Sequence, residues 1–314
     1  MPLQDNFIKI KKRLFMTATL KTSNFKKQNK LGYEQIVYSM KNEKQYGRIV
    51  DEFTFVKARN RGVICPIKVV ISIVSNDELH YRNISKTAVN IDNQSVKTEQ
   101  VAHQIAIKNA VSKFKTKKLF TFHSLCEDAE SFTAKGSEGI KTHLPNFSCG
   151  YVDGKMSMQE REGIMQEFKN EENAIVSNAR CLIEGVNIPT VDMVTFVSPK
   201  KSAVDIVQAS GRAMRIRGVK NKKFGYILLP IFVEKFRGEK IGKAIKRTQF
   251  QVVLRFLKAL SDYDESIKEE ISDIVIKNFR DKGTIQKIKK RQKEKEERLI
   301  EFVGRSFDIE EIES

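Results

Sequence analysis

The chain alternates short apolar runs with longer polar segments that have helical periodicity. The runs are rich in valine, isoleucine and phenylalanine, and they cover residues 13–19, 67–74, 118–122, 146–152, 173–178, 191–197 and 224–230. Segments 98–114, 124–135 and 156–170 space their apolar residues about 3.6 positions apart, as in amphipathic helices. Strands that alternate with helices are typical of a parallel sheet covered on both faces. The pattern therefore predicts an α/β fold.

Local signals refine the helices and indicate where the sheet ends. Ser157 is followed three residues later by Glu160, which is typical of a capping box at a helix start. From about Phe236 the pattern changes to long amphipathic helices without strands, at residues 247–271 and 287–302. Acidic and basic residues at i, i+3 and i+4 in the second segment favour a solvated or lightly packed helix over a dedicated binding arm. We therefore expect an α-helical C-terminal extension after the sheet.

The composition favours a globular protein with a polyanionic partner. The chain has 314 residues, of which 40% are hydrophobic, so it can form one large or two ordinary domains with a buried core. Its formal net charge of +18 favours nucleic acid as the partner first and an anionic membrane surface second. No apolar run approaches the roughly 20 residues that span a bilayer, and the first residues lack the pattern of a signal peptide. We expect a cytoplasmic protein with no membrane partner.

The cysteines and histidines form no metal-binding pattern in the sequence. Cys65, Cys126, Cys149 and Cys181 are widely scattered, and neither a CxxC pair nor a histidine at ligand spacing accompanies them. The 4 histidines are equally isolated, and we interpret each as a surface or packing residue rather than a ligand. We therefore expect reduced thiols and no metal site.

The stretch VDIVQASGRAMRIRG, residues 204–218, combines apolar residues with arginines and glycines. On a helix, Gln208, Arg212 and Arg215 fall on one face at i, i+4 and i+7, while apolar neighbours turn toward a core. Gly211 removes a side chain from the middle of that face, although glycine costs about 1 kcal/mol in a helix interior. Two interpretations stay open from these residues alone: a face that binds a polyphosphate, or a solvated basic helix.

The surrounding sequence resembles motifs V and VI of the superfamily 2 helicases, which are nucleic-acid-dependent ATPases built from two RecA-like domains. Gln208, Gly211, Arg212 and Arg215 match the QxxGRxxR of motif VI one by one. EGVNIP, residues 184–189, matches the motif V loop that is usually written EGVDxP. Each motif follows a predicted strand, so the resemblance implies a RecA-like parallel sheet with helices on both faces.

Further motifs occur in the order that this family shows. FMTATL resembles motif III, with Thr17 and Thr19 in their places and Leu20 where proline is usual. KLFTFHSLCEDAESF, residues 118–132, resembles motif IV, and YVDGKMSMQERE resembles the stretch after it. The sequence around motifs V and VI is similar to that of the large helicases of bacterial and phage restriction or defence systems. The resemblance covers about residues 11 to 262.

The resemblance implies ATP with Mg²⁺ as the cofactor, held between two RecA-like domains. It assigns catalysis to Gln208, Arg212 and Arg215, and nucleotide contacts to Gly185, Asn187 and Gly211. Asn187 replaces the usual aspartate, so it can accept one hydrogen bond from the ribose but carries no charge. Thr17 and Thr19 are the expected interdomain coupling residues. Candidate contacts to a nucleic-acid strand are Thr121, His123, Ser124, Asp153, Gly154, Ser177, Asn178 and Arg180.

Motif III normally follows a phosphate loop and an acidic Mg²⁺-binding box, yet here it lies close to residue 1. No GxxxxGK(S/T) loop or acidic box precedes it, so the Mg²⁺ ligands are expected on a missing domain. We expect the end of a first RecA-like domain with a linker over 1–64, a second RecA-like domain over 65–233, and a helical extension over 234–314.

The expected function is that of the C-terminal half of an ATP-dependent DNA helicase or translocase, which is inactive as an ATPase alone. The expected partners are DNA, the missing phosphate-loop domain, and a nuclease or methylase of a restriction or defence system. The alternative is a basic nucleic-acid-binding protein that retains the helicase fold without ATP turnover. A third interpretation, an unrelated anion-binding module, requires the ordered motifs to be accidental.

Overall fold

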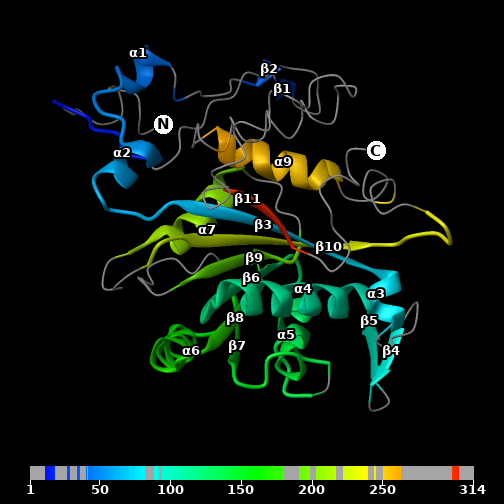
Figure 1. The fold of residues 1–314 in the computed structure, drawn as a ribbon. Helices are drawn as coiled ribbons and strands as arrows, with labels where there is room; N and C mark the ends of the chain where they lie inside the picture. The colour runs from blue at the N-terminus through cyan, green and yellow to red at the C-terminus, as the bar shows by residue number, and fades with distance from the viewer. Residues whose placement is uncertain are drawn as a thin grey trace. The chain divides into compact units, whose positions relative to one another are not determined.

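The structure, a computed structural model, divides the chain into two units, residues 1–53 and 54–314 (Figure 1). It describes residues 11–17, 27–28, 34–35, 40, 42–81, 88–91, 94–136, 138–179, 191–198, 203–216, 222–239, 244, 250–262, 267 and 299–303. These two units do not test the expected boundaries at residues 64 and 233, which stay predictions.

The second unit is built on a 7-stranded sheet in which all the strands run parallel. The order across the sheet is β11-β3-β10-β9-β6-β8-β7. The strands are β3 (Ile67–Ser75), β6 (Lys118–His123), β7 (Ser148–Asp153), β8 (Ala174–Ala179), β9 (Met193–Phe196), β10 (Gly225–Val233) and β11 (Ile300–Val303). The expected parallel α/β sheet is confirmed.

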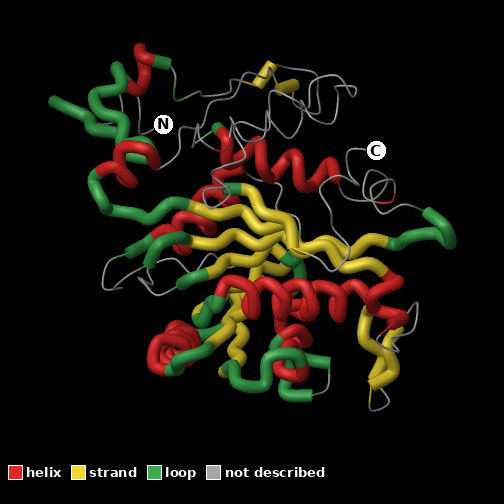
Figure 2. Tube along the Cα trace, viewed as in Figure 1, coloured by secondary structure: helices red, strands yellow, loops and turns green. Residues whose placement is uncertain are grey.

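Helices connect the strands, as Figure 2 shows. They are α3 (Asn76–Tyr81), α4 (Thr98–Phe114), α5 (Cys126–Phe132), α6 (Met158–Asn170), α7 (Ala203–Met214) and α9 (Phe250–Ser261), with a short 3₁₀ turn at Ile140–Thr142. Smaller elements are β1 (Lys27–Gln28), β2 (Glu34–Gln35), α1 (Glu43–Tyr46), α2 (Phe55–Asn60) and the hairpin strands β4 (Ala88–Ile91) and β5 (Gln94–Lys97).

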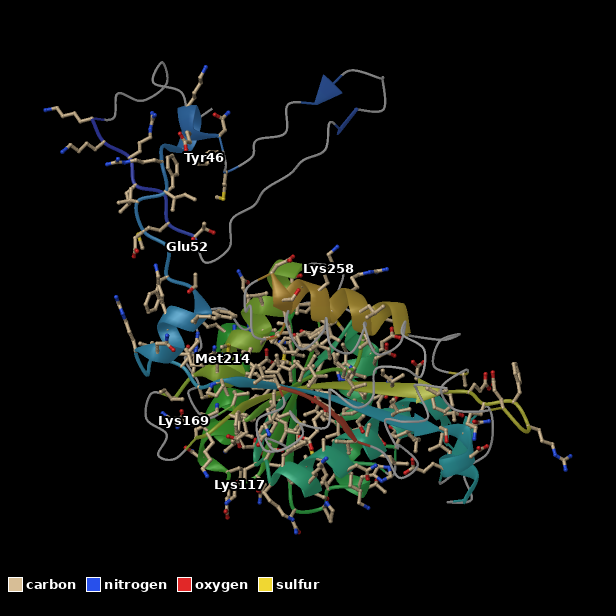
Figure 3. All side chains as sticks on the ribbon, turned by 45° about the horizontal axis from the view of Figure 1, so that its top comes forward. Tyr46, Glu52, Lys117, Lys169, Met214 and Lys258 are labelled. Carbon is tan, nitrogen blue, oxygen red and sulfur yellow. The ribbon has the colours of Figure 1, made fainter. Side chains whose placement is uncertain are left out.

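The two faces of the sheet bury separate hydrophobic clusters. Successive side chains of a strand point to opposite faces, so Leu119 packs with residues of α4 and α5 while Phe120 packs with residues of α6, α7 and α9. Figure 1 shows α7 and α9 on one side of the sheet and α4 and α5 on the other, and Figure 3 shows side chains filling the layers between them. Burial on both faces explains why the strands read as continuous apolar runs.

Local sequence signals placed several helix boundaries correctly. The predicted helix over 98–114 is α4 with the same bounds. Ser157 caps α6 through its side chain, and the Glu160 side chain bonds back to the Ser157 backbone, which confirms the predicted capping box. The predicted helix over 124–135 is shorter in the structure, because α5 ends at Phe132.

The C-terminal region corrects one expectation. Residues 287–302 were expected to form a helix, but Ile300–Val303 form β11, which pairs in parallel with β3. Ile300 is buried, and Glu301 forms an ion pair with Lys113 of α4. Without β11, β3 would present unpaired backbone groups at the sheet edge, and such an edge favours pairing with another strand. The nearby helix α9 agrees with the helical extension expected over 247–271.

Several large apolar side chains of the first unit are exposed. Leu14 is 75% exposed, Met16 86% and Val50 80%, although all three are large apolar side chains. Phe15 and Tyr46 form an edge-to-face contact with ring centroids 5.1 Å apart. Residues 13–17 were expected to begin a strand, yet they form none, because a lone strand leaves its backbone groups unpaired.

Candidate functional site

Helix α7 presents the candidate arginines on a face that solvent reaches. One side of α7 is buried, and its residues are Ile206, Val207, Ala209, Ser210, Ala213 and Met214. Gln208 is exposed, and Gly211, Arg212 and Arg215 are half-buried on the other side. The predicted helix with an apolar side is confirmed for residues 203–214, which include Gln208 and Arg212, whereas Arg215 follows the last helical residue and bridges to Ile64. The catalytic roles of Gln208, Arg212 and Arg215 stay predictions.

Gly211 leaves open space in the middle of this face. A Cβ atom added at Gly211 would meet nothing within 4 Å, whereas one added at Gly225 would lie 2.3 Å from the Ala213 carbonyl oxygen. Packing therefore requires glycine at position 225 but not at position 211. Because glycine weakens a helix by about 1 kcal/mol, the open position at Gly211 is consistent with close approach of a bound group.

Several strand-contact candidates lie at the carboxyl ends of β6 and β8. Thr121 Oγ1 lies 2.8 Å from Ser177 Oγ and 3.0 Å from His123 Nε2. Thr121, Ser177 and His123 are at most 1% exposed, and the His123 ring packs 4.9 Å from that of Phe132. The three side chains form a buried polar cluster near the carboxyl ends of β6 and β8. The neighbouring residue Ser124 is exposed. Contact with a nucleic-acid strand stays a prediction for all four residues.

Asp153 uses both carboxylate oxygens within the chain. Its Oδ2 accepts a hydrogen bond from the Tyr151 hydroxyl at 2.6 Å, and its Oδ1 accepts from the backbone N–H groups of Lys155 at 2.8 Å and Met156 at 3.0 Å. These bonds, the one from Tyr151 foremost, lower the pKa of Asp153. Burial, aided by Asp153, raises the pKa of Tyr151. Asp153 thus holds the turn that leads into α6, and Gly154 in that turn is exposed.

Asn178 is 1% exposed, and its side chain has no hydrogen-bond partner in the structure. An unsatisfied buried polar group costs about 1–3 kcal/mol, so its side chain is a plausible binding group only if a ligand or a rearrangement supplies partners. Arg180, Gly185, Asn187 and Thr19 lie outside the described residues. Thr17 is described, in the first unit, and is exposed.

The structure places the arginines and the candidate contacts to a nucleic-acid strand at opposite ends of the parallel β-strands. Ile64 bridges to Arg215, and the Cys65 N–H donates to the Met214 carbonyl at 2.9 Å, so α7 ends beside the start of β3. Thr121 and Ser177 lie near the carboxyl ends of β6 and β8, which run parallel to β3 within the same sheet. The candidate residues therefore form two groups rather than one continuous site.

Sequence reasoning missed the residues that hold the end of α7, which are Cys65 and Lys222. Lys222 donates hydrogen bonds to the carbonyls of Val191 and Arg215. It is one of many lysines in a basic chain, and no sequence pattern marks it. Its partners are brought together only by the crossover from β9 through α7 to β10.

The described residues were also compared with the requirements of a metal site and of a membrane-spanning helix. Among them, no group of three His, Cys, Asp or Glu side chains is placed to hold a metal ion. In the part of the chain that the structure describes, no helix has both the length and the apolar character needed to cross a bilayer. Cys65, Cys126 and Cys149 are free thiols.

Comparison with known proteins identifies the region that contains both groups. Residues 99–217 match the helicase conserved C-terminal domain. The match covers less than half of the chain, and it shows that this region is similar to that domain. The matched region begins within α4 and extends past α7, so it contains the motif VI residues as well as the polar cluster at the ends of β6 and β8.

Proteins from a yeast and an archaeon are similar to parts of this chain. A Saccharomyces cerevisiae protein named as an ATP-dependent helicase is 32% identical over 71 residues, which are 23% of this chain and 10% of that protein. A Methanocaldococcus jannaschii protein named as an ATP-dependent RNA helicase is 30% identical over 116 residues, which are 36% of this chain and 15% of that protein. The chain therefore matches only a small part of each relative's length.

A solved structure is similar in fold to most of this chain. The ATP-dependent Type ISP restriction-modification enzyme LlaBIII bound to DNA has a TM-score of 0.66 to this chain at 24% identity. The match covers 94% of this chain and 19% of that enzyme. It confirms the RecA-like fold that the motifs implied.

Proposed function

We propose that this helicase C-terminal domain acts in an ATP-dependent DNA helicase or translocase and supplies arginines to an ATP site that a phosphate-loop domain completes. The observation that carries the proposal is the motif VI pattern of Gln208, Gly211 and Arg212 on α7 with Arg215 directly after it, because all four residues stay accessible to solvent. An amphipathic helix needs no such arrangement to pack its apolar side.

The chemistry of these residues fits a polyphosphate. A guanidinium beside the γ-phosphate offsets negative charge that develops during phosphoryl transfer, and arginine fingers accelerate such reactions by about 10³ to 10⁵. Its planar fork matches phosphate oxygens in a way that lysine does not. The gap at Gly211 leaves room for the nucleotide to approach. Gly185 and Asn187 of the motif V loop are the proposed contacts to the nucleotide and its ribose.

The proposed partner for ATP binding is a phosphate-loop domain outside these 314 residues. Such a domain holds the phosphates and Mg²⁺ in this class of enzyme. Thr17 and Thr19 are proposed to couple the two domains.

DNA is the proposed nucleic acid, bound by its backbone without sequence specificity. The formal net charge of +18 supports a polyanionic partner. Ser124 and Gly154 are the accessible members of the proposed strand contacts, next to the buried cluster of Thr121, His123 and Ser177. A nuclease or methylase of a restriction system is the proposed further partner, in the cytoplasm.

An ATPase assay with the two halves separate and combined tests this proposal. Alone, the chain should hydrolyse ATP at a negligible rate, because arginines cannot position a nucleotide without a phosphate loop and Mg²⁺ ligands. Combined with its phosphate-loop domain, in trans or by fusion, it should show ATPase activity that single-stranded DNA stimulates more than RNA of the same sequence.

Two outcomes of that assay contradict the proposal in different ways. Substantial ATPase activity of the purified chain alone would show that the nucleotide site is complete without a partner. If DNA binds but the combined protein has no stimulated activity, the chain is a basic nucleic-acid-binding protein that retains the helicase fold.

DNA binding itself should weaken steeply as salt rises. Each neutralised phosphate of a single strand contributes a slope of about −0.7 to the plot of log affinity against log salt concentration. With about six contacts, the affinity should fall about 300-fold between roughly 50 and 200 mM salt. Fluorescence anisotropy with a labelled oligonucleotide measures this slope, and an affinity that does not change over this range would contradict binding through the backbone.

A further inference from the structure

The carbonyl end of α7 is held by groups from two distant segments of the chain. A helix leaves its last carbonyl oxygens without intrahelical partners. Here the Cys65 backbone N–H donates to the Met214 oxygen at 2.9 Å, and the Cys65 thiol lies 3.4 Å from the same atom. The Lys222 ammonium donates to the Arg215 oxygen at 3.1 Å. The positive charge also lies where the helix dipole favours a cation.

Lys222 ties this helix end to a second functional segment. Its ammonium also donates to the carbonyl of Val191, which follows the motif V residues 184–189 closely in sequence. One side chain therefore connects the backbone that leaves motif V with the backbone that ends motif VI. Burial lowers the pKa of Lys222, while the nearby Cys65 and Asp192 oppose that shift. The carbonyls thus replace much of the water that an ammonium normally binds.

Close backbone packing restricts where the end of α7 can lie. Gly225 begins β10 directly against the last turn, with space for a Cβ blocked by the Ala213 carbonyl oxygen at 2.3 Å. The Gly225 N–H bonds to the Pro66 carbonyl at 2.9 Å, which fixes β10 beside the segment that contains Cys65. The last turn of α7 therefore packs closely against β10, and Lys222 binds the carbonyl of Arg215, the residue that directly follows the helix.

We propose that Lys222 is a positioning residue that fixes the backbone at Arg215 and thereby directs the Arg215 guanidinium toward the nucleotide. This inference rests on the proposed function of the arginines. The atom that Lys222 holds belongs to Arg215 itself, so a shift of that carbonyl moves the root of the arginine side chain. A misplacement of about 1 Å at a reacting group can lower a rate about 100-fold.

Lys118 provides a matched control within the same domain. It is 8% exposed, and its ammonium donates to the carbonyls of Phe168, Lys169 and Glu171 at the end of α6. The chemistry is the same as at Lys222, but α6 carries none of the proposed catalytic residues. A purely structural role for such a lysine predicts equal consequences at the two positions, whereas positioning of Arg215 predicts a loss of catalysis at Lys222 alone.

The test compares Lys222→Met, Lys222→Gln and Lys222→Arg with Lys118→Met in the enzyme combined with its phosphate-loop domain. We expect Lys222→Met to lower kcat about 100-fold with little change in the KM for ATP. Lys222→Gln should be intermediate, and Lys222→Arg should restore most of the rate, because it still donates to both carbonyls. Lys118→Met should reduce thermal stability and leave kcat within about twofold.

Two further measurements separate failure of this inference from failure of the proposed function. In an Arg215→Ala background, Lys222→Met should cause no further loss in single-turnover rate, since the group it positions is gone. Amide hydrogen exchange of this chain alone should show faster exchange at the Cys65 N–H and in α7 for Lys222→Met, but not for Lys118→Met.

Full kcat in Lys222→Met beside an inactive Arg215→Ala would overturn the inference about Lys222 and leave the proposed function intact. Equal losses of kcat in Lys222→Met and Lys118→Met would also overturn it. Full activity of Arg215→Ala would reject the proposed role of the arginine and, with it, any positioning role of Lys222. If Lys222→Met does not fold, the comparison of Lys222→Gln with Lys222→Arg decides the question.

Discussion

Replacing Arg212 or Arg215 with alanine should lower the ATPase rate of the combined enzyme by about 10³-fold or more while the protein stays folded. Both side chains are half-buried, Arg212 on α7 and Arg215 directly after the last residue of that helix. Neither is among the residues that fill the hydrophobic clusters, so their truncation leaves no core cavity. The measurements are steady-state ATPase rate and thermal unfolding of each variant.

Arg255→Ala is the matched control for these variants. Arg255 lies on the exposed side of α9, a helix that packs against the same face of the sheet as α7. Its replacement removes the same charge without touching the proposed site, so activity should stay near that of the parent enzyme. If Arg212→Ala and Arg215→Ala unfold the protein while their folded fraction keeps full activity, both arginines are structural and the proposed mechanism is wrong.

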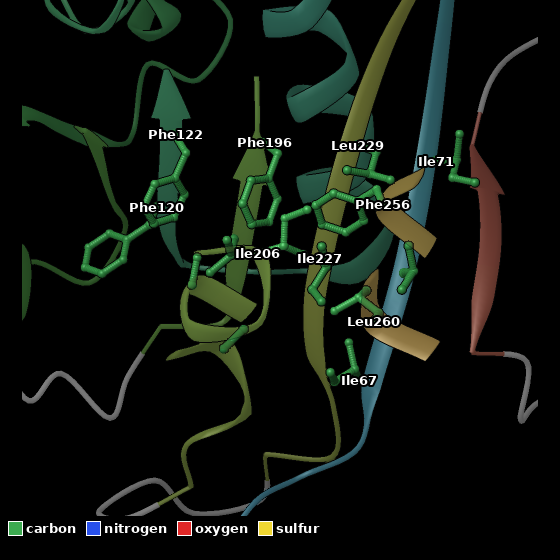
Figure 4. Close-up of a cluster of buried hydrophobic side chains, with 14 of the residues drawn as sticks. Ile67, Ile71, Phe120, Phe122, Phe196, Ile206, Ile227, Leu229, Phe256 and Leu260 are labelled. Carbon is green, nitrogen blue, oxygen red and sulfur yellow. The ribbon is translucent and has the colours of Figure 1, made fainter. Parts of the chain in front are cut away.

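Phe196→Ala should destabilise the second unit by about 3–5 kcal/mol, a large part of the stability of a typical domain. The Phe196 side chain is 4% exposed and stacks on Phe122 of β6, with ring centroids 5.4 Å apart. It also packs edge-on against Phe256 of α9 at 4.7 Å (Figure 4). Truncation therefore leaves a cavity and removes two aromatic contacts. Urea unfolding followed by circular dichroism measures the change.

Two further variants are compared with Phe196→Ala, one at an exposed position and one in the same hydrophobic cluster. Phe236→Ala makes the same chemical change at a side chain that is 63% exposed, and its effect should stay within about 0.5 kcal/mol. Phe256→Ala should cost about as much as Phe196→Ala, because α9 belongs to the same hydrophobic cluster. A separate unfolding transition for α9, with the rest of the unit unaffected, would show that the extension does not share this core.

The sequence by itself was sufficient wherever short-range pattern decides structure. Strands buried on both faces must be apolar throughout, so β3 and β10 were visible as runs of valine, isoleucine and leucine. Helix α6 begins where Ser157 and Glu160 satisfy each other's backbone N–H groups, a contact within one turn. The shared face of Gln208 and Arg212 follows from helical periodicity, whereas the chain leaves the helix after Met214 and Arg215 bridges to Ile64.

The tertiary structure decided everything that depends on distant partners. Ile300–Val303 looked like the end of a charged helix, and only the open edge of β3 makes it a strand. The hairpin of β4 and β5 was also missed, since its strands are short and pair only with each other. Strand order has the same origin, because β3 and β10 pair across about half of the chain.

The residues of the candidate site show the same difference between what the sequence indicates and what only the fold decides. Residue types near motifs indicated Thr121, His123 and Ser177 as strand contacts, but the fold buries all three in one polar cluster. Sequence spacing cannot reveal this, since burial depends on which helix covers the end of each strand. Lys222 is the opposite case: it carries no sequence signal, yet the crossover through α7 brings its ammonium to the carbonyl oxygens of Val191 and Arg215. Hydrogen bonds to backbone carbonyls require no particular side chain in the partner, so only the folded chain determines which residues such a lysine holds.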